Sequence, residues 1–183
     1  QHLPQALPQE VGMDGNKMKY ADRAINQSIA NKEIPGAVLA VVRNGKMAYL
    51  KAYGNLQTYP SAIAMNVNSV FDLASVTKPV ATAISTMILV ERGQIRLLDK
   101  VNLYIPNFKG WSKGREGKDI RIIDLLTHTS GLPAYASINS VKKTRGATNP
   151  DKLINYIATV EREFEPQTDF KYSCLNYITL QRI

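Results

Sequence analysis

The feature that most constrains the fold is a pair of strand-like apolar runs separated by a tight turn. The runs span residues 36–42 and 46–53, and the turn between them contains Asn44-Gly45. Asparagine and glycine both tolerate the positive φ angles that a two-residue hairpin turn requires. The sequence therefore predicts an antiparallel β-hairpin over residues 36–53, preceded by an amphipathic helix over residues 17–31.

The rest of the chain indicates one domain with a leader. Residues 1–14 contain two prolines and no hydrophobic period, which predicts an extended segment on the surface. Residues 15–183 are expected to form the N-terminal part of a single domain, in which a helical region from about residue 70 follows the hairpin. The chain has no internal repeat and no low-complexity linker that would indicate a second domain.

Ser75 and Lys78 form an S-x-x-K motif, with a hydroxyl and an amine one helical turn apart. A serine hydroxyl is a poor nucleophile at its free pKa, but a nearby lysine amine that desolvation holds neutral can accept its proton. Pro79 lacks a backbone N–H and is best tolerated in the first turn of a helix, which predicts a helix that begins near Ser75 and ends at Gly93. Free N–H groups at this helix start can stabilise a developing oxyanion.

Two further motifs accompany this one. Residues 71–78 read FDLASVTK, residues 125–133 read LLTHTSGLP, and residues 170–173 read FKYS. Together they resemble the serine β-lactamase-related family, which includes class C β-lactamases, D-alanyl-D-alanine carboxypeptidases and β-lactamase-like esterases. The resemblance covers about residues 15–183 and implies an α+β fold of the β-lactamase/transpeptidase type, an α/β sandwich with a helical subdomain.

The resemblance also implies a reaction and the residues that perform it. Ser75 would be the acylated nucleophile, Lys78 its proton-relay partner, and Tyr172 the group that moves a proton between serine, leaving group and water. A protonated Lys78 favours the phenolate of Tyr172, and a pair that shares one proton can act first as base and then as acid. The implied function is a serine hydrolase that acts through an acyl-serine on an ester, an amide or a β-lactam.

Cys174 departs from the commoner family pattern, which has tyrosine, any residue and then asparagine. An asparagine would offer an amide to the lysine and the substrate, whereas a thiol is a weak donor and acceptor. Cys174 is therefore a candidate substrate-binding residue, and a buried small residue is the alternative. The departure also supports a second hypothesis, a non-catalytic binding or regulatory relative of the same fold.

His128 invites another interpretation, a catalytic triad with Ser75 and either Asp124 or Asp169. The sequence favours the family pattern instead, because G-x-S-x-G is absent and His128 lies in a stretch that the family shares as a structural turn. The family's third motif, a lysine or histidine followed by serine or threonine and then glycine, should follow Tyr172. It does not occur in the 183 residues.

The absence of the third motif leads to an expectation about completeness. In the resembled fold, this motif lies on a C-terminal strand beside the hairpin. We expect the chain to be the N-terminal piece of a longer protein, with its C-terminal strands absent, so that the fold is incomplete and the piece alone is inactive. We also expect apolar side chains of the hairpin and of the nucleophile helix to be exposed in this piece.

Composition excludes several other functions. The 23 basic and 15 acidic side chains give a net charge of +8. This charge permits binding to a polyanion, a third hypothesis that ranks last, because no nucleic-acid-binding motif is present. One cysteine and two histidines provide no metal site, no cofactor is expected, and no apolar run approaches the roughly 18 residues of a membrane span.

The expected partner is a small-molecule or peptide substrate. Gln1 in place of an initial methionine indicates an exported protein, periplasmic or at the cell surface. The densest basic cluster is expected in an exposed loop and consists of Lys109, Lys113, Arg115, Lys118 and Arg121.

Overall fold

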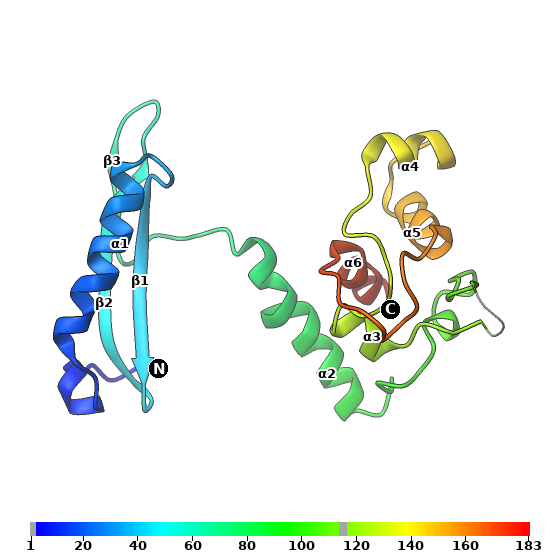
Figure 1. Cartoon of the computed structure of the whole chain (residues 1–183), viewed down its shortest axis with the longest axis horizontal. Coiled ribbons are helices and arrows are strands. Elements are labelled where there is room, and N and C mark those ends of the chain that lie inside the picture. Colours follow the sequence, from blue (N-terminus) through cyan, green and yellow to red (C-terminus); the bar gives the residue numbers. More distant parts are fainter. Residues whose placement is uncertain (1–2, 114–116) are drawn as a thin grey trace. The chain divides into compact units, whose positions relative to one another are not determined.

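The computed structural model describes residues 3–113 and 117–183. They form two compact units, Gln1–Asp72 and Leu73–Ile183 (Figure 1). Arg115 of the predicted basic loop lies outside the described residues. The expectation that residues 15–183 belong to a single domain stays a prediction.

The first unit is built on the predicted hairpin. Strands β1 (Gly36–Arg43) and β2 (Lys46–Gln57) pair antiparallel, and β3 (Ile63–Ala64) adds a short third strand in the order β1-β2-β3. Asn44 and Gly45 have φ angles of 53° and 71°, as the tight turn requires, so the hairpin prediction is confirmed. Strand β2 runs beyond its predicted end, because residues after Tyr53 pair with β3, which the sequence did not indicate.

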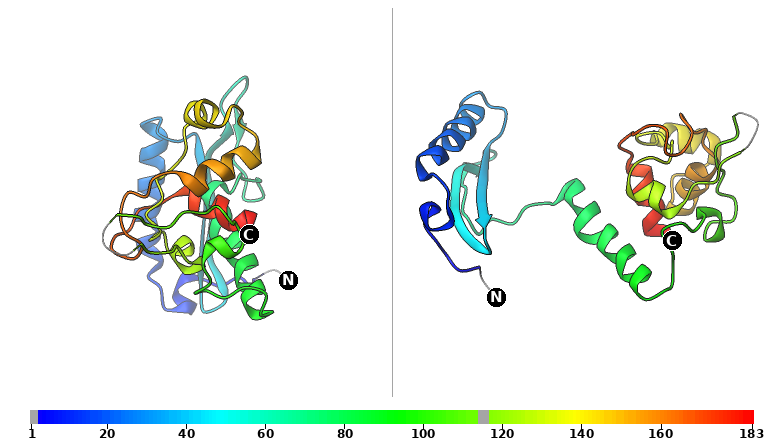
Figure 2. Two further views of the ribbon diagram at one scale, coloured as in Figure 1. Left: turned by 90° about the vertical axis from the view of Figure 1, so that its right-hand side faces the viewer. Right: turned by 60° about the horizontal axis from the view of Figure 1, so that its bottom comes forward.

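Helix α1 (Met18–Ala30) lies along the hairpin (Figures 1 and 2). One carboxylate, that of Asp22, joins the two elements. It accepts hydrogen bonds of 2.6 Å from both Tyr49 and Tyr53 and forms an ion pair of 3.1 Å with Lys51. These three donors come from one strand, β2, and therefore hold the helix against the sheet.

The leader is extended only as far as Leu7. The N–H of Met47 donates to the carbonyl of Pro4 (2.8 Å), so that the segment pairs with the start of β2. Residues Pro8–Val11 then form a 3-10 helix, η1, and Val11 is buried. The sequence analysis did not anticipate this turn. The carboxylate of Glu10 stabilises it locally by accepting the N–H of Leu7 (2.7 Å), and Arg43 of the hairpin donates to the carbonyl of Gly12 just after it (3.0 Å).

The second unit begins with an irregular helix start. Ala74–Val76 is a 3-10 turn (η3), Lys78–Ala83 is a π-helical turn (η4), and the regular helix α2 covers Ile84–Glu91. The predicted helix is thus present, but its first turns are not α-helical, because Pro79 has no N–H to donate to the carbonyl four residues back. It ends as predicted at Gly93, which has a φ angle of 68°.

After a 3-10 turn, η5 (Val101–Leu103), four α-helices complete the described part of this unit: α3 (Ile122–Leu126), α4 (Ile138–Arg145), α5 (Pro150–Thr159) and α6 (Cys174–Arg182). Asn149 caps α5 by accepting a hydrogen bond from the N–H of Lys152 (2.9 Å), and Ser173 caps α6. The core of the unit consists of buried apolar side chains from these helices and the segments between them, including Val101, Phe108, Ile122, Leu125, Leu132, Ile157 and Leu175.

Apolar side chains are exposed where the sequence predicts it. On the helix that follows Ser75, Val80, Ile84 and Met87 are each about half exposed (48–52%). In the first unit, Val42 and Leu50 of the hairpin are exposed as well. Within the described ranges, no helix combines the length and the hydrophobicity needed to cross a membrane.

Candidate active site

Ser75 and Lys78 face each other at the start of the helix that leads into α2. The ammonium nitrogen Nζ of Lys78 donates to Oγ of Ser75 at 3.0 Å. Ala74, immediately before the serine, has a φ angle of 43°, in the left-handed region that residues with a side chain rarely adopt. This conformation turns the chain sharply into the 3-10 helix that carries Ser75, which is exposed to solvent.

Tyr172 lies next to Lys78, although it is 94 residues away in the chain. The Nζ atom of Lys78 is 5.2 Å from the centre of the Tyr172 ring. Hydrogen bonding from Lys78, and secondarily from Ser75, lowers the pKa of the Tyr172 phenol. The same hydrogen bond with Tyr172 raises the pKa of Lys78. The structure therefore brings the three predicted residues together in one cluster.

These pKa directions correct one expectation. The sequence analysis considers a Lys78 that desolvation holds neutral, as well as a protonated Lys78 that favours the phenolate of Tyr172. The effect of Tyr172 is larger than that of desolvation, and the pKa of Lys78 is raised, which disagrees with the neutral form. Lys78 is only partly buried, so its charged form remains solvated while the phenolic oxygen stabilises it further. In this arrangement the lysine is a cation, and Tyr172 is the group whose basic form it favours.

Cys174 also lies near Lys78, at the first position of α6. Its thiol contributes to the raised pKa of Lys78, after Tyr172 and against desolvation. Its backbone N–H donates to the carbonyl of Ala134 at 2.8 Å, and its side chain is half-buried. The predicted substrate-binding residue thus belongs to the same cluster, and its role stays a prediction.

His128 contacts the tyrosine and not the serine. Its ring lies 4.6 Å from the ring of Tyr172 and 5.2 Å from that of Tyr177, measured between centroids. Its Nδ1 atom accepts the backbone N–H of Ser173 (3.1 Å) and faces the amide nitrogen of Asn176 (3.1 Å). Because Nδ1 faces these donors, the ring is neutral with its proton on Nε2. Burial, with a smaller effect of the Lys78 charge, lowers the pKa of His128 in agreement with this.

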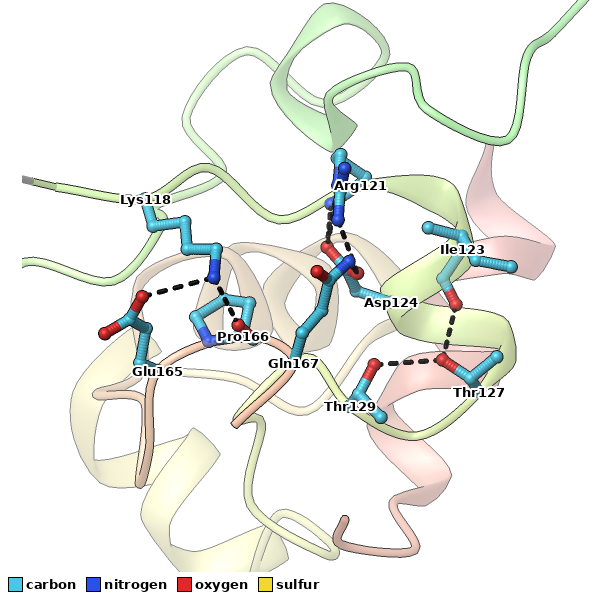
Figure 3. Close-up of polar contacts among 9 residues, drawn as sticks. All are labelled: Lys118, Arg121, Ile123, Asp124, Thr127, Thr129, Glu165, Pro166 and Gln167. Carbon is cyan, nitrogen blue, oxygen red and sulfur yellow. Dashed lines mark hydrogen bonds and ion pairs between the residues drawn. The ribbon is translucent and has the colours of Figure 1, made fainter. Parts of the chain in front are cut away.

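The triad with an aspartate finds no support in this geometry. The buried carboxylate of Asp124 accepts a hydrogen bond from Gln167 (2.6 Å) and pairs with Arg121 (3.4 Å), as Figure 3 shows. Asp169 is exposed, and its carboxylate accepts the N–H of Phe170. Neither aspartate supplies the contact to Nδ1 of His128 that a triad would need.

The segment before Tyr172 is held by polar contacts that the sequence did not reveal (Figure 3). Gln167, which has a φ angle of 72°, donates through its N–H to the carbonyl of Thr129 (2.8 Å) and through its side chain to Asp124. Nearby, Lys118 donates to Glu165 (3.1 Å) and to the carbonyl of Pro166 (2.7 Å). These contacts hold residues 165–167 against α3 and the segments on both sides of it, and so position the chain that continues to Tyr172.

Asn176 is a second residue that sequence reasoning missed. It is fully buried, accepts a hydrogen bond of 2.5 Å from the hydroxyl of Ser130, and presents its nitrogen to His128. Its sequence neighbours are apolar residues of the last helix, and this could have indicated a buried amide. A buried polar side chain has hydrogen-bond partners, so such an amide would have pointed to a contact. It links the segment of residues 125–133 to α6.

The family model described as Beta-lactamase matches residues 21–183. The chain belongs to the beta-lactamase family. Its fold is a mixed α/β fold of the β-lactamase and penicillin-binding-protein type, as predicted. The catalytic roles of the clustered Ser75, Lys78 and Tyr172 stay a prediction.

The relatives are hydrolases by name. The chain is 34% identical over 174 residues to an N-acetylmuramyl-L-alanine amidase from Bacillus subtilis (strain 168), an alignment that covers 90% of this chain and 39% of that protein. It is 32% identical over 189 residues to a protein assigned by inference as a D-alanyl-D-alanine carboxypeptidase from Salmonella agona (strain SL483), with 97% of this chain and 43% of that protein covered. At family level they support a serine-hydrolase-like function.

Solved structures agree on the fold. EstCE1, a hydrolase with promiscuous acyltransferase activity, superposes with a TM-score of 0.73 at 24% identity and covers 90% of this chain and 46% of its own. This likeness bears on the fold alone. The chain spans less than half the length of each of these three relatives, at 39%, 43% and 46%, so the fold is incomplete in these residues.

Proposed function

We propose that the protein is a serine hydrolase in which Ser75 forms an acyl intermediate with an ester, an amide or a β-lactam. The observation that carries the proposal is the contact of 3.0 Å between Nζ of Lys78 and Oγ of Ser75, with Tyr172 on the same ammonium. The serine hydroxyl and a tyrosine of lowered pKa thus meet at one cation, which is the arrangement that nucleophilic catalysis needs.

The proposed reaction uses Tyr172 as the proton carrier. Its phenolate, which the Lys78 cation favours, accepts the hydroxyl proton of Ser75 as Oγ attacks the substrate carbonyl. When the tetrahedral intermediate collapses, the leaving group departs with that proton from Tyr172, and an acyl-serine remains. The phenolate then accepts a proton from water, the water oxygen attacks the acyl carbon, and Ser75 leaves with the proton. Lys78 stays positively charged throughout and acts through its electrostatic effect on Tyr172.

Two further parts of the site are proposed, in addition to Ser75, Lys78 and Tyr172. We infer that a further segment of the same protein supplies the third motif, because the 183 residues contain none. The half-buried thiol of Cys174 would contact the acyl side of the substrate, in place of an asparagine amide. Because a thiol binds amides weakly, this substitution favours an ester or a small acyl group over a peptide amide.

The names of the two curated relatives suggest a substrate class and a place of action. N-acetylmuramyl-L-alanine and D-alanyl-D-alanine both contain an amide bond to alanine. We propose cell-wall peptides as the first amide substrates to test, and an exported, periplasmic or cell-surface location, where such substrates occur.

A second candidate is a binding or regulatory relative that keeps the fold and forms no acyl-enzyme. The observation that favours it is Cys174, which replaces the amide that would hold the substrate near Lys78. The two candidates differ in one measurable event, the covalent modification of Ser75.

The test is acylation of the protein at its full native length by a fluorescent penicillin and by an activated ester. Intact mass should rise by the acyl group, and a peptide map should place the label on Ser75. The Ser75→Ala variant should lose the label, whereas Ser85→Ala, an exposed serine on α2, should keep it. Labelling of another residue refutes the assignment, and reversible binding without a mass change establishes the second candidate.

A further inference from the structure

A hollow beside α4 and α5 is lined by basic side chains that are distant from one another in the sequence. Its volume is about 610 Å³, and its lining includes Lys109, Arg145 and Lys152. The other lining side chains are neutral donors or acceptors, two of them being Asn107 and Asn155. No described aspartate or glutamate lines it. We call these residues the cationic hollow.

The three cations of the hollow differ from several other basic residues of this unit, which are paired with carboxylates. Among the described residues, Lys113 pairs with Glu161 (2.5 Å), Lys118 with Glu165 (3.1 Å), and Arg182 with Asp151 (3.1 Å). The hollow's own cations form none of the ion pairs found in the described ranges. Asp151, which precedes Lys152 in the sequence, is engaged by Arg182, and Glu161 is engaged by Lys113. The charge of the hollow is therefore not neutralised by the described part of the chain.

Arg145 is held in place by hydrogen bonds that use only part of its guanidinium N–H donors. Its Nη2 atom donates to the carbonyl of Asn155 (3.2 Å) and to the hydroxyl of Thr159, both on α5. A guanidinium carries five N–H donors in a rigid fork, and these contacts use only one of its nitrogens. Its Nε atom is buried and lacks an acceptor within the described structure, so the donors that remain for a ligand are those of the terminal nitrogens. The cation is thus pre-positioned at the hollow, so an anion that binds there need not order it.

We propose that the cationic hollow binds a phosphate group carried on a larger polyhydroxylated ligand, such as a sugar phosphate. The guanidinium fork and two lysines match a tetrahedral oxyanion with up to two negative charges. The hollow is much larger than a phosphate ion, and its amides and hydroxyls can bind the ligand's hydroxyl groups. A monocarboxylate is a poorer match than a phosphate, because it presents only one negative charge and two oxygens to the three cations of the hollow.

The proposal is independent of the reaction proposed above. It rests on residues 107–159, none of which belongs to the cluster of Ser75, Lys78 and Tyr172. The Ser75→Ala variant should therefore bind the phosphate ligand as the unaltered protein does.

The test measures binding of glucose 1-phosphate, inorganic phosphate and glucose to the protein at its full native length by isothermal titration calorimetry. Glucose 1-phosphate should bind more tightly than phosphate, and glucose should not bind. Lys109→Gln and Lys152→Gln should each weaken binding about tenfold, the effect of losing one charge-assisted hydrogen bond. The matched control is Lys143→Gln, which removes the same charge from an exposed position on α4 that does not line the hollow, and it should leave binding unchanged.

Three results would overturn the proposal. One is the absence of any binding by either phosphate compound. Another is an equal loss in Lys143→Gln, which would show diffuse attraction by the net charge of +8. The third is tighter binding of inorganic phosphate than of glucose 1-phosphate, which would refute the larger ligand. Thermal unfolding of each variant checks that the fold is retained, and Arg145 is left unaltered because it also links α4 to α5.

Discussion

Replacing His128 should separate its role as a hydrogen-bond acceptor from its role as an aromatic ring. In His128→Phe, the ring contacts with Tyr172 and Tyr177 are retained, but the buried Ser173 N–H and the Asn176 amide lose their acceptor. A buried donor without a partner costs about 1–3 kcal/mol. Because the single lone pair of Nδ1 serves both donors, we expect His128→Phe to lower the free energy of unfolding by about 2 kcal/mol.

His128→Asn is the matched variant. The side-chain oxygen of asparagine can take the place of Nδ1, and asparagine tolerates the φ angle of 60° at this position better than phenylalanine does. Only the ring contacts are lost, so the expected cost is about 1 kcal/mol. In the acylation assay, His128→Asn should retain more activity than His128→Phe. It keeps a hydrogen bond to the backbone N–H of Ser173, which holds the backbone next to Tyr172 in place.

The pH dependence of stability provides a second readout. Burial lowers the pKa of His128 below its ordinary value of 6.5, so the unfolded chain binds the proton more readily than the folded one. The contribution of His128 to the free energy of unfolding is fully present above pH 6.5 and is lost as the pH drops toward the lowered pKa. Urea unfolding between pH 5 and pH 7.5 should show this fall in the unaltered protein and lack its His128 component in His128→Asn. Equal costs for the two variants, or an unchanged pH dependence in His128→Asn, would refute the acceptor role.

Three other perturbations follow from the structure. Lys78→Met should raise the pKa of Tyr172, move the rate of ester acylation to higher pH and lower it by about a hundredfold at neutral pH, which stopped-flow acylation measures; an unshifted pH profile contradicts the pairing. Asp124→Asn leaves the charge of Arg121 without its buried partner and should cost about 3 kcal/mol in urea unfolding, so a cost below about 1 kcal/mol would contradict the network. Hydrogen bonds from two tyrosines lower the pKa of Asp22 from 3.8 to about 2. The contribution of the Asp22 carboxylate to the stability of the first unit is therefore present above pH 3.8 and is lost toward pH 2. Acid unfolding followed by circular dichroism should begin at higher pH in Asp22→Asn, and an unchanged onset would argue against this anchor.

Local signals explain what could be predicted about the fold. The hairpin follows from Asn44-Gly45, whose positive φ angles are a property of the two residues themselves. The start of α5 follows from Asn149 in the same way, because an N-cap bonds to a backbone group only three residues away. In contrast, β3 and the pairing of the leader with Met47 depend on contacts across the chain, and their sequences carry no strong strand pattern.

The sequence by itself determined which residues are the candidates for chemistry, through the motifs that contain Ser75, Lys78 and Tyr172. Only the tertiary structure decided their charge states. A lysine is neutral or cationic according to the balance between its burial and its partners, and here the partner is a tyrosine distant in sequence. The same reason applies to the basic residues. Lys113 and Lys118, clustered in the sequence, are paired with carboxylates, whereas Lys109, Arg145 and Lys152 meet only when the chain folds. Electrostatic effects depend on distance in space, which the order of residues does not specify.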